Sequence, residues 1–141
     1  MKKLLLALLL GGSVCAFAQE NFWTTLAEVG FENRKDKDGY EVEVPLFSKH
    51  LKTFQGKKIK IKGYVIPLAE VGDQSRFMLS ALPFNLCYFC GAAGPETVME
   101  IDSSEKIKFT SKAIVMEGVL ILNDKDPNHH MYILKSAHLT N

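Results

Sequence analysis

The feature that most constrains the fold is a run in which lysines alternate with apolar residues, over residues 57–66. A period of two places alternate side chains on opposite faces of a β-strand, so this run predicts a strand with one solvent-exposed face and one buried face. Gly63 interrupts the run and suits a bulge or a sharp bend in a long strand. The sequence therefore predicts a β-domain whose first strand is long and bent at a glycine.

Four more strands are predicted after this one, each bounded by turn-forming or polar residues. They cover residues 76–82, 97–101, 113–122 and 131–138. Five strands over about 80 residues fit a small barrel of the oligonucleotide/oligosaccharide-binding (OB) type better than a sandwich, which usually has more strands. The helix expected between the third and fourth strands is missing, because residues 103–112 are too short and too polar for one. The predicted fold class is mainly β, a small five-stranded OB-like barrel with one or two short N-terminal helices.

The segment before the barrel is predicted to be helical and extended. Apolar residues recur at helical spacing over residues 22–31, Asn21 is placed to cap the first turn, and Gly30 is placed to stop the helix. Ser48 is placed to cap a second short helix. Between the two helices, residues 33–39 form a charged stretch that ends in a turn signal, and residues 40–44 alternate like a strand.

The N-terminal residues have the composition of a signal peptide. Two lysines precede an apolar run over residues 4–10, and an Ala-x-Ala cleavage signal ends at Ala18. The run is shorter than the roughly 20 residues that a membrane-spanning helix needs. We therefore expect cleavage before Gln19 and a periplasmic or secreted mature protein. Lipoprotein attachment through Cys15 is the less favoured alternative, because Val14 is bulkier than such sites usually tolerate.

The mature chain is predicted to be one domain. Removal of residues 1–18 leaves 123 of the 141 residues, enough for one core and too few for two. We assign residues 19–56 to a helical and extended segment packed on the barrel, and residues 57–141 to the OB-like barrel. The formal charge changes from +1 to −1 when two lysines are removed, which leaves no basic excess for binding nucleic acid. No later segment is apolar enough to span a membrane.

The sharpest chemical feature is the pair Cys87 and Cys90, which is followed directly by Gly91. This spacing places two thiols on one side of a tight turn, where both can reach one metal ion or each other. Signal-peptide cleavage would leave only these two cysteines, in a compartment where disulfides persist. Three interpretations therefore stay open: a metal site, a disulfide staple and a redox dithiol.

A metal site would need further ligands besides the two thiolates, which favour zinc or copper(I). His129 and His130 are adjacent in the polar loop between the last two strands. Adjacent side chains in an extended segment point in opposite directions, so we expect at most one of them to join the cysteines. His50, His138 and Glu96 are further candidates, although surface or packing roles are favoured for these two histidines.

The two other interpretations make different use of the thiols. A disulfide between Cys87 and Cys90 would close a very small loop, so it would staple that loop and do little else. Thiol–disulfide exchange usually places the first cysteine at the N-terminus of a helix, where the helix dipole lowers its pKa. Here Gly91, Gly94 and Pro95 follow the pair and oppose a helix, so the redox interpretation is the least favoured.

A family resemblance rests on residues 56–68 (GKKIKIKGYVIPL), residues 77–79 (FML) and the cysteine loop. From residue 23 to the C-terminus, the chain resembles a family of secreted bacterial proteins catalogued as domain of unknown function 3299. The resemblance implies an OB-type barrel. Some members are encoded beside ABC-type transport systems linked to metal limitation, which implies an envelope protein or such a transport system as partner. Many relatives carry Cys-x-His where this chain has Cys87 and Cys90, and that exchange would preserve a soft metal ligand.

The leading functional hypothesis from the sequence is an exported, non-enzymatic accessory protein that binds a soft metal ion, with zinc as the expected ligand. Its metal-ligating residues are Cys87 and Cys90, together with His129 or His130. The alternative is a disulfide-stapled protein-interaction module of the cell envelope. The third hypothesis is a thiol-disulfide oxidoreductase.

Overall fold

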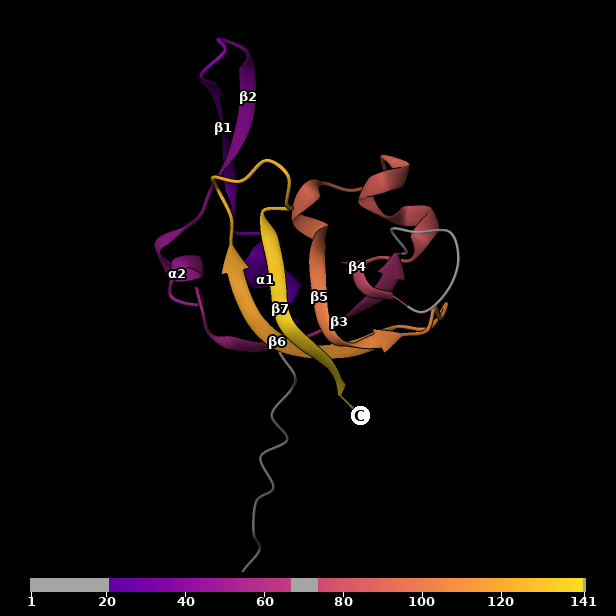
Figure 1. The fold of residues 1–141 in the computed structure, drawn as a ribbon. Coiled ribbons are helices and arrows are strands. Elements are labelled where there is room, and N and C mark those ends of the chain that lie inside the picture. The colour runs from indigo at the N-terminus through magenta and orange to yellow at the C-terminus, as the bar shows by residue number, and fades with distance from the viewer. Residues whose placement is uncertain (1–20, 67–73, 141) are drawn as a thin grey trace, which may run out of the picture.

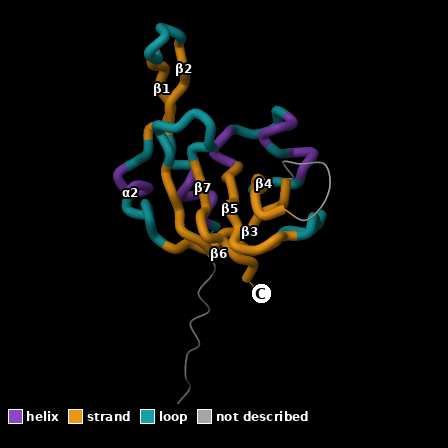
Figure 2. Tube along the Cα trace, viewed as in Figure 1, coloured by secondary structure: helices purple, strands orange, loops and turns teal. Residues whose placement is uncertain are grey.

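A five-stranded barrel forms the body of the protein. The computed structural model of the chain describes residues 21–66 and 74–140. The barrel strands are β3 (Lys58–Ile66), β4 (Gln74–Ser80), β5 (Val98–Ile107), β6 (Ile114–Leu122) and β7 (Tyr132–Thr140). They close in the order β3-β4-β5-β7-β6, as Figure 1 and Figure 2 show. The pairing of β5 with β7 is parallel and the other barrel pairings are antiparallel. This Greek-key arrangement confirms the predicted mainly β, OB-like barrel.

The first barrel strand pairs with two neighbours in succession. Residues 58–63 of β3 pair with β6, and residues 64–66 pair with β4. A Cβ atom at Gly63 would lie 2.6 Å from the carbonyl oxygen of Ser80 and 2.8 Å from Cγ of Leu79. The predicted long strand is therefore confirmed, and the glycine allows β4 to approach closely at the point where β3 changes partners.

The apolar residues of the strands fill the barrel, and two short helices of the N-terminal segment pack on it. The short helices α1 (Phe22–Leu26) and α2 (Lys49–Lys52) add Trp23, Leu26 and Leu51 to the core. The buried hydroxyl of Tyr132 donates a hydrogen bond to the Leu26 carbonyl at 2.6 Å. Burial raises the pKa of Tyr132, so this hydroxyl keeps its proton and acts as a donor. These contacts join α1 to the last barrel strand.

The predicted N-terminal helix is shorter than expected. Asn21 caps α1 as predicted, but the helix ends at Leu26, before the predicted stop at Gly30. Residues 30–35 instead form β1 (Gly30–Lys35), which pairs with β2 (Glu41–Leu46) in an antiparallel hairpin. Local helical spacing predicted a short helix that ends at Gly30, and the pairing of residues 30–35 with β2 overrides the end of this pattern. The hairpin projects away from the barrel in Figure 1.

Two other boundaries differ from the sequence-based expectation. The charged residues 103–107 belong to β5, which is longer than predicted because it continues to pair with β4 and β7. Pro45 lies inside β2 opposite Phe31, where an edge strand tolerates a residue without an amide hydrogen. The predicted signal peptide, with Cys15, lies outside the described residues. Within the described ranges, no helix has the length and apolar character needed to cross a membrane.

Replacing Gly63 with alanine tests the close approach of β3 and β4. We expect Gly63→Ala to lower the free energy of unfolding by about 1–3 kcal/mol, because the new methyl group meets the Ser80 carbonyl. Gly30→Ala is the matched control, since its Cβ would lie 3.8 Å from Cβ of Leu46, an ordinary contact. Urea unfolding of both variants measures the difference. Equal stability of the two would contradict the proposed role of Gly63.

Candidate functional site

The loop between β4 and β5 carries the two cysteines and is ordered by three short 3₁₀ helices. These are η1 (Phe84–Leu86), η2 (Tyr88–Cys90) and η3 (Pro95–Thr97). Gly91 ends η2 with a φ of 72°, a left-handed conformation that glycine adopts without steric cost. Pro95 occupies the start of η3, where its fixed φ suits a helical turn. The prolines and glycines seen in the sequence thus produce a folded loop, which we call the cysteine loop, residues 81–97.

The two thiols of the cysteine loop have different environments. Cys87 is fully buried in a small apolar cluster with Ile66 of β3, Met78 of β4 and Val98 of β5. Cys90 is exposed and its thiol donates to the Phe84 carbonyl at 3.0 Å. Both cysteines are free in the structure. Cys87 therefore anchors the loop to the barrel, while Cys90 lies on the solvent-exposed side of the loop.

The ionisation of Cys90 bears on the redox hypothesis. The pKa of the Cys90 thiol is raised, first by its desolvation and then by the neighbouring Cys87 thiol. A raised pKa lowers the thiolate fraction, and the thiolate is the attacking species in disulfide exchange. Oxidoreductases lower the pKa of their exposed cysteine instead. The arrangement thus gives no support to the third hypothesis.

Large apolar side chains around the cysteines point into solvent. The exposed fractions are 59% for Phe84, 50% for Leu86, 39% for Tyr88 and 52% for Phe89. The rings of Tyr88 and Phe89 pack edge to face with centroids 5.5 Å apart. No charged residue occurs in the sequence from residue 81 to residue 95. Residues 81–95 of the cysteine loop therefore present an uncharged, largely aromatic surface, and buried Cys87 anchors it.

A second group of polar side chains lies on the barrel wall near the loop between β6 and β7. The carboxylate of Glu100 accepts a hydrogen bond from Arg76 at 2.7 Å and lies 3.0 Å from Nδ1 of His129. It also accepts the backbone amide hydrogen of His130 at 3.3 Å. Burial alone would raise the pKa of Glu100, but these hydrogen bonds outweigh it and hold the pKa below its ordinary value. Glu100 is thus a buried, ionised group that joins a strand to a loop.

The β6–β7 loop is held in place by Asn123. Its side-chain oxygen accepts the amide hydrogen of Asp126 at 3.0 Å, and its amide nitrogen donates to the carbonyls of Asp126 and His129. The polar sequence of this loop thus folds back on its first residue, as asparagine commonly does in turns. This turn places His129 against Glu100.

His130 is a packed residue of the fold. Its Nδ1 accepts the amide hydrogen of Tyr132 at 3.2 Å. Desolvation lowers its pKa, although contacts with Tyr132, Glu100 and the backbone of Pro95 oppose the shift. The ring is therefore neutral at pH 7, and one of its nitrogens is already engaged. The contact with Pro95 also shows that the β6–β7 loop meets the cysteine loop.

The structure brings the two cysteines close together but adds no histidine to them. Within residues 21–66 and 74–140, no three His, Cys, Asp or Glu side chains are grouped so that they could hold one metal ion. His129 is directed to Glu100, and His130 is packed against Tyr132. Metal binding by Cys87 and Cys90 stays a prediction.

Sequence analysis did not identify Glu100 or Arg76. The one available signal was an acidic residue within an otherwise apolar run, since residues 98–101 read Val-Met-Glu-Ile and all four are buried. A buried carboxylate requires a partner, and the register of β4 and β5 supplies Arg76 beside it. Arg76, Glu100, Asp102, His129, Ile133 and Lys135 line a shallow hollow on this wall.

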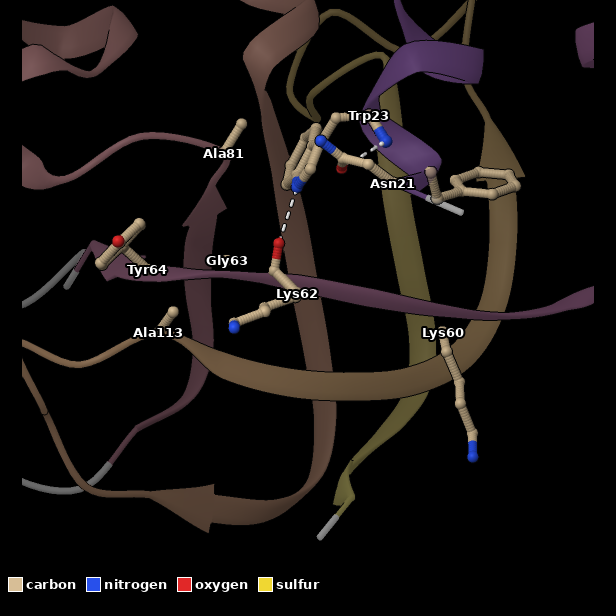
Figure 3. A pocket seen from close by; sticks show the side chains of 9 residues that line it. Asn21, Trp23, Lys60, Lys62, Gly63, Tyr64, Ala81 and Ala113 are labelled. Atoms are coloured by element: carbon tan, nitrogen blue, oxygen red, sulfur yellow. Dashed lines mark hydrogen bonds between the residues drawn. The ribbon is translucent and has the colours of Figure 1, made fainter. Parts of the chain in front are cut away.

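Another hollow lies beside α1 and β3 (Figure 3). The indole nitrogen of Trp23 donates to the Lys62 carbonyl at 2.7 Å, so the polar atom of this ring is already used within the fold. The remaining walls include two lysine side chains, Tyr64 and two alanines. No set of groups suited to one ligand converges there among the described residues.

Replacing Glu100 with glutamine tests its role as an ionised link. At pH 7 we expect Glu100→Gln to lower the free energy of unfolding by about 1–3 kcal/mol, because Arg76 and His129 lose a charged acceptor. Asp102→Asn, an exposed carboxylate in the same hollow, should change it by less than about 0.5 kcal/mol.

The same variant has a predicted pH dependence. A lowered pKa in the fold contributes stability that is present above the ordinary value of 4.5 and is lost as the pH falls through the folded pKa. The wild type should therefore lose more stability on acidification than Glu100→Gln does. Urea unfolding of both proteins, from pH 7 to below the ordinary pKa of 4.5, measures this difference. If the free energies of unfolding of both proteins fell in parallel with pH, Glu100 would not be the ionised link.

Comparisons with known proteins support the fold. No protein-family profile matches the chain, and no curated protein matches it. The crystal structure of a DUF3299 family protein from Pseudomonas aeruginosa PAO1 is similar, with a TM-score of 0.50 and 14% sequence identity over 69% of this chain and 68% of that one. At this identity the likeness shows the fold alone. The chain therefore shares its barrel fold with a DUF3299 family protein, in agreement with the family that its sequence resembles.

Proposed function

We propose that this chain is an exported interaction module that docks on a protein of the cell envelope through the cysteine loop. The observation that carries the proposal is the set of four exposed apolar side chains, Phe84, Leu86, Tyr88 and Phe89, within six residues. Aromatic side chains buried in the centre of an interface supply much of its binding energy. Single exposed apolar residues are common on protein surfaces, whereas several on one loop are typical of an interaction site. Their concentration therefore favours a docking surface.

The anchoring of the loop adds to this proposal. Cys87 is buried against strands β3, β4 and β5, and η3 at the other end of the loop meets His130. A surface that is ordered before binding loses less conformational entropy when the partner arrives. The aromatic side chains are thus presented on a fixed frame rather than on a flexible segment.

The composition of the loop selects the class of partner. An anionic membrane surface attracts lysine and arginine, and residues 81–95 contain neither. The same segment contains no acidic residue that would seek a basic partner. An uncharged apolar patch on an envelope protein is the complementary surface.

In an oxidising compartment Cys87 and Cys90 would staple this loop. The Cys87 thiol lies near enough to Cys90 to help raise the pKa of the Cys90 thiol. Exchange with an oxidised partner disulfide would form the bond, passing two electrons and two protons to that partner. The staple would fix η2 and its two aromatic rings. The proposed function does not require the staple, because Cys87 is already an apolar anchor.

Zinc binding is the second candidate, and the nearness of the two thiols favours it. The described residues provide only these two ligands, so the remaining positions of a tetrahedral site would be completed by a partner or by water. Mass spectrometry of the protein purified without chelator separates the two states. The staple predicts a metal-free protein whose mass is two hydrogens lower than that of the reduced chain. A metal that is bound by the wild type and lost in Cys90→Ser would instead support the zinc site.

Docking is tested by substitutions within the loop. Photo-crosslinkers placed at positions 84 and 89 in the exporting cell should capture the same envelope protein. Phe109 is the matched control, because it is 60% exposed but lies outside the cysteine loop. Position 109 should give no such product.

The captured protein is then purified and its affinity is measured by calorimetry. We expect Phe89→Ser to weaken binding by tenfold or more, as loss of about 1.4 kcal/mol would do, and Phe109→Ser to leave it unchanged. Melting temperatures establish that both variants fold. Equal binding by the two variants, or equal capture at all three positions, would reject the cysteine loop as the docking surface.

A further inference from the structure

The β1–β2 hairpin leaves the outer edge of β1 open. The hairpin extends from the barrel, and its six residue pairs join β1 only to β2 among the described residues (Figure 1, Figure 2). A strand edge of this kind offers amide and carbonyl groups for pairing with another strand. A two-stranded hairpin is marginally stable in water, whereas three or more strands are stable. An additional strand would therefore stabilise this element.

We propose that two copies of this chain pair through the open edges of β1, antiparallel and centred on Asn33. A two-fold axis perpendicular to the plane of the hairpin sheet places Asn33 opposite Asn33 of the other copy. Glu32 of each copy then lies opposite Arg34 of the other, on the same face of the sheet. Opposite charges in directly facing positions stabilise an antiparallel pair. The edge is thus complementary to itself, and the two copies form one four-stranded sheet.

Neighbouring two-fold registers are unfavourable. An axis at Glu32 places that carboxylate opposite its copy, and an axis at Arg34 places two guanidinium groups opposite each other. Like charges in facing positions destabilise the pairing. Within one chain Glu32 and Arg34 already form an ion pair, so both side chains lie on the face where the second copy would meet them. Of these three registers, the charge pattern therefore favours the one centred on Asn33.

The other edge of the hairpin is unsuited to the same pairing. β2 contains Pro45, which has no amide hydrogen to donate. A two-fold register centred on residue 42 would place Glu41 opposite Glu43, and one centred on residue 43 would place Glu43 opposite its own copy. Pairing of two copies is therefore expected through β1.

The apolar residues of the hairpin fit this arrangement. Val42 and Leu46 share a face with Glu32 and Arg34, and they are 37% and 41% exposed. In the four-stranded sheet, Val42 and Leu46 of both copies lie on one face, on either side of the paired charges. The contact uses the six residues of β1 in each copy. This contact buries less surface than the roughly 1,200 Å² of a stable interface, so a weak and concentration-dependent dimer is expected.

Single charge reversals and their mixture test the proposal. Glu32→Arg makes positions 32 and 34 of β1 both positive, and Arg34→Glu makes both of these positions negative. We expect sedimentation velocity to show a concentration-dependent dimer for the wild type and a monomer for each variant. In an equal mixture of the two variants, position 32 of each copy again faces an opposite charge at position 34 of the other copy. Native mass spectrometry should then detect a dimer that contains one copy of each variant.

The mixture separates pairing between copies from loss of the internal ion pair. Both variants lose the pair between Glu32 and Arg34 within the chain, so that loss alone would leave the mixture monomeric. Circular dichroism and melting curves check that each variant folds, and Phe89→Ser should dimerise like the wild type. A monomeric wild type at the highest concentrations, dimers of either variant alone, or a mixture without the mixed dimer would overturn the proposal.

Discussion

The barrel depends on the pairing of β3 with two strands in turn, first with β6 and then with β4. Gly63 lies at this change of partner, where a side chain would collide with the end of β4. The close approach brings Ile66 and Met78 together, and Val98 of β5 completes the cluster that buries Cys87. The position of the cysteine loop is thus a consequence of how the barrel closes. The exposed aromatic residues are held by the same contacts.

Ionised groups stabilise the neighbouring loop in a different way. Glu100 is buried in an apolar strand, and the cost of its charge is offset by hydrogen bonds from Arg76, His129 and the His130 amide. These bonds hold the β6–β7 loop against the barrel, and His130 in turn meets Pro95 of the cysteine loop. The two loops therefore form a continuous ordered surface. One is anchored by a buried thiol and the other by a buried carboxylate.

Local patterns predicted the parts of the fold that depend on local sequence. The period of two in residues 57–66 identified β3, and the polar side chains of Asn21 and Ser48 identified the two helix caps. The hairpin was missed in part because its strand β1 is defined by pairing with residues on β2, which local periodicity does not encode. The Cys-x-x-Cys spacing drew attention to the cysteine loop, but the burial of only Cys87 and the pairing of Glu100 with His129 arise from tertiary contacts.

The central claim is that the cysteine loop is covered by a protein partner in the cell envelope. Covalent footprinting of aromatic side chains tests it directly, because the same residues are labelled in intact cells and in the purified protein. Labelling of Phe84, Tyr88 and Phe89 should fall in cells, while labelling of Phe109 should be the same in both samples. Equal labelling of the loop in cells and in solution would show a free surface and would contradict the account.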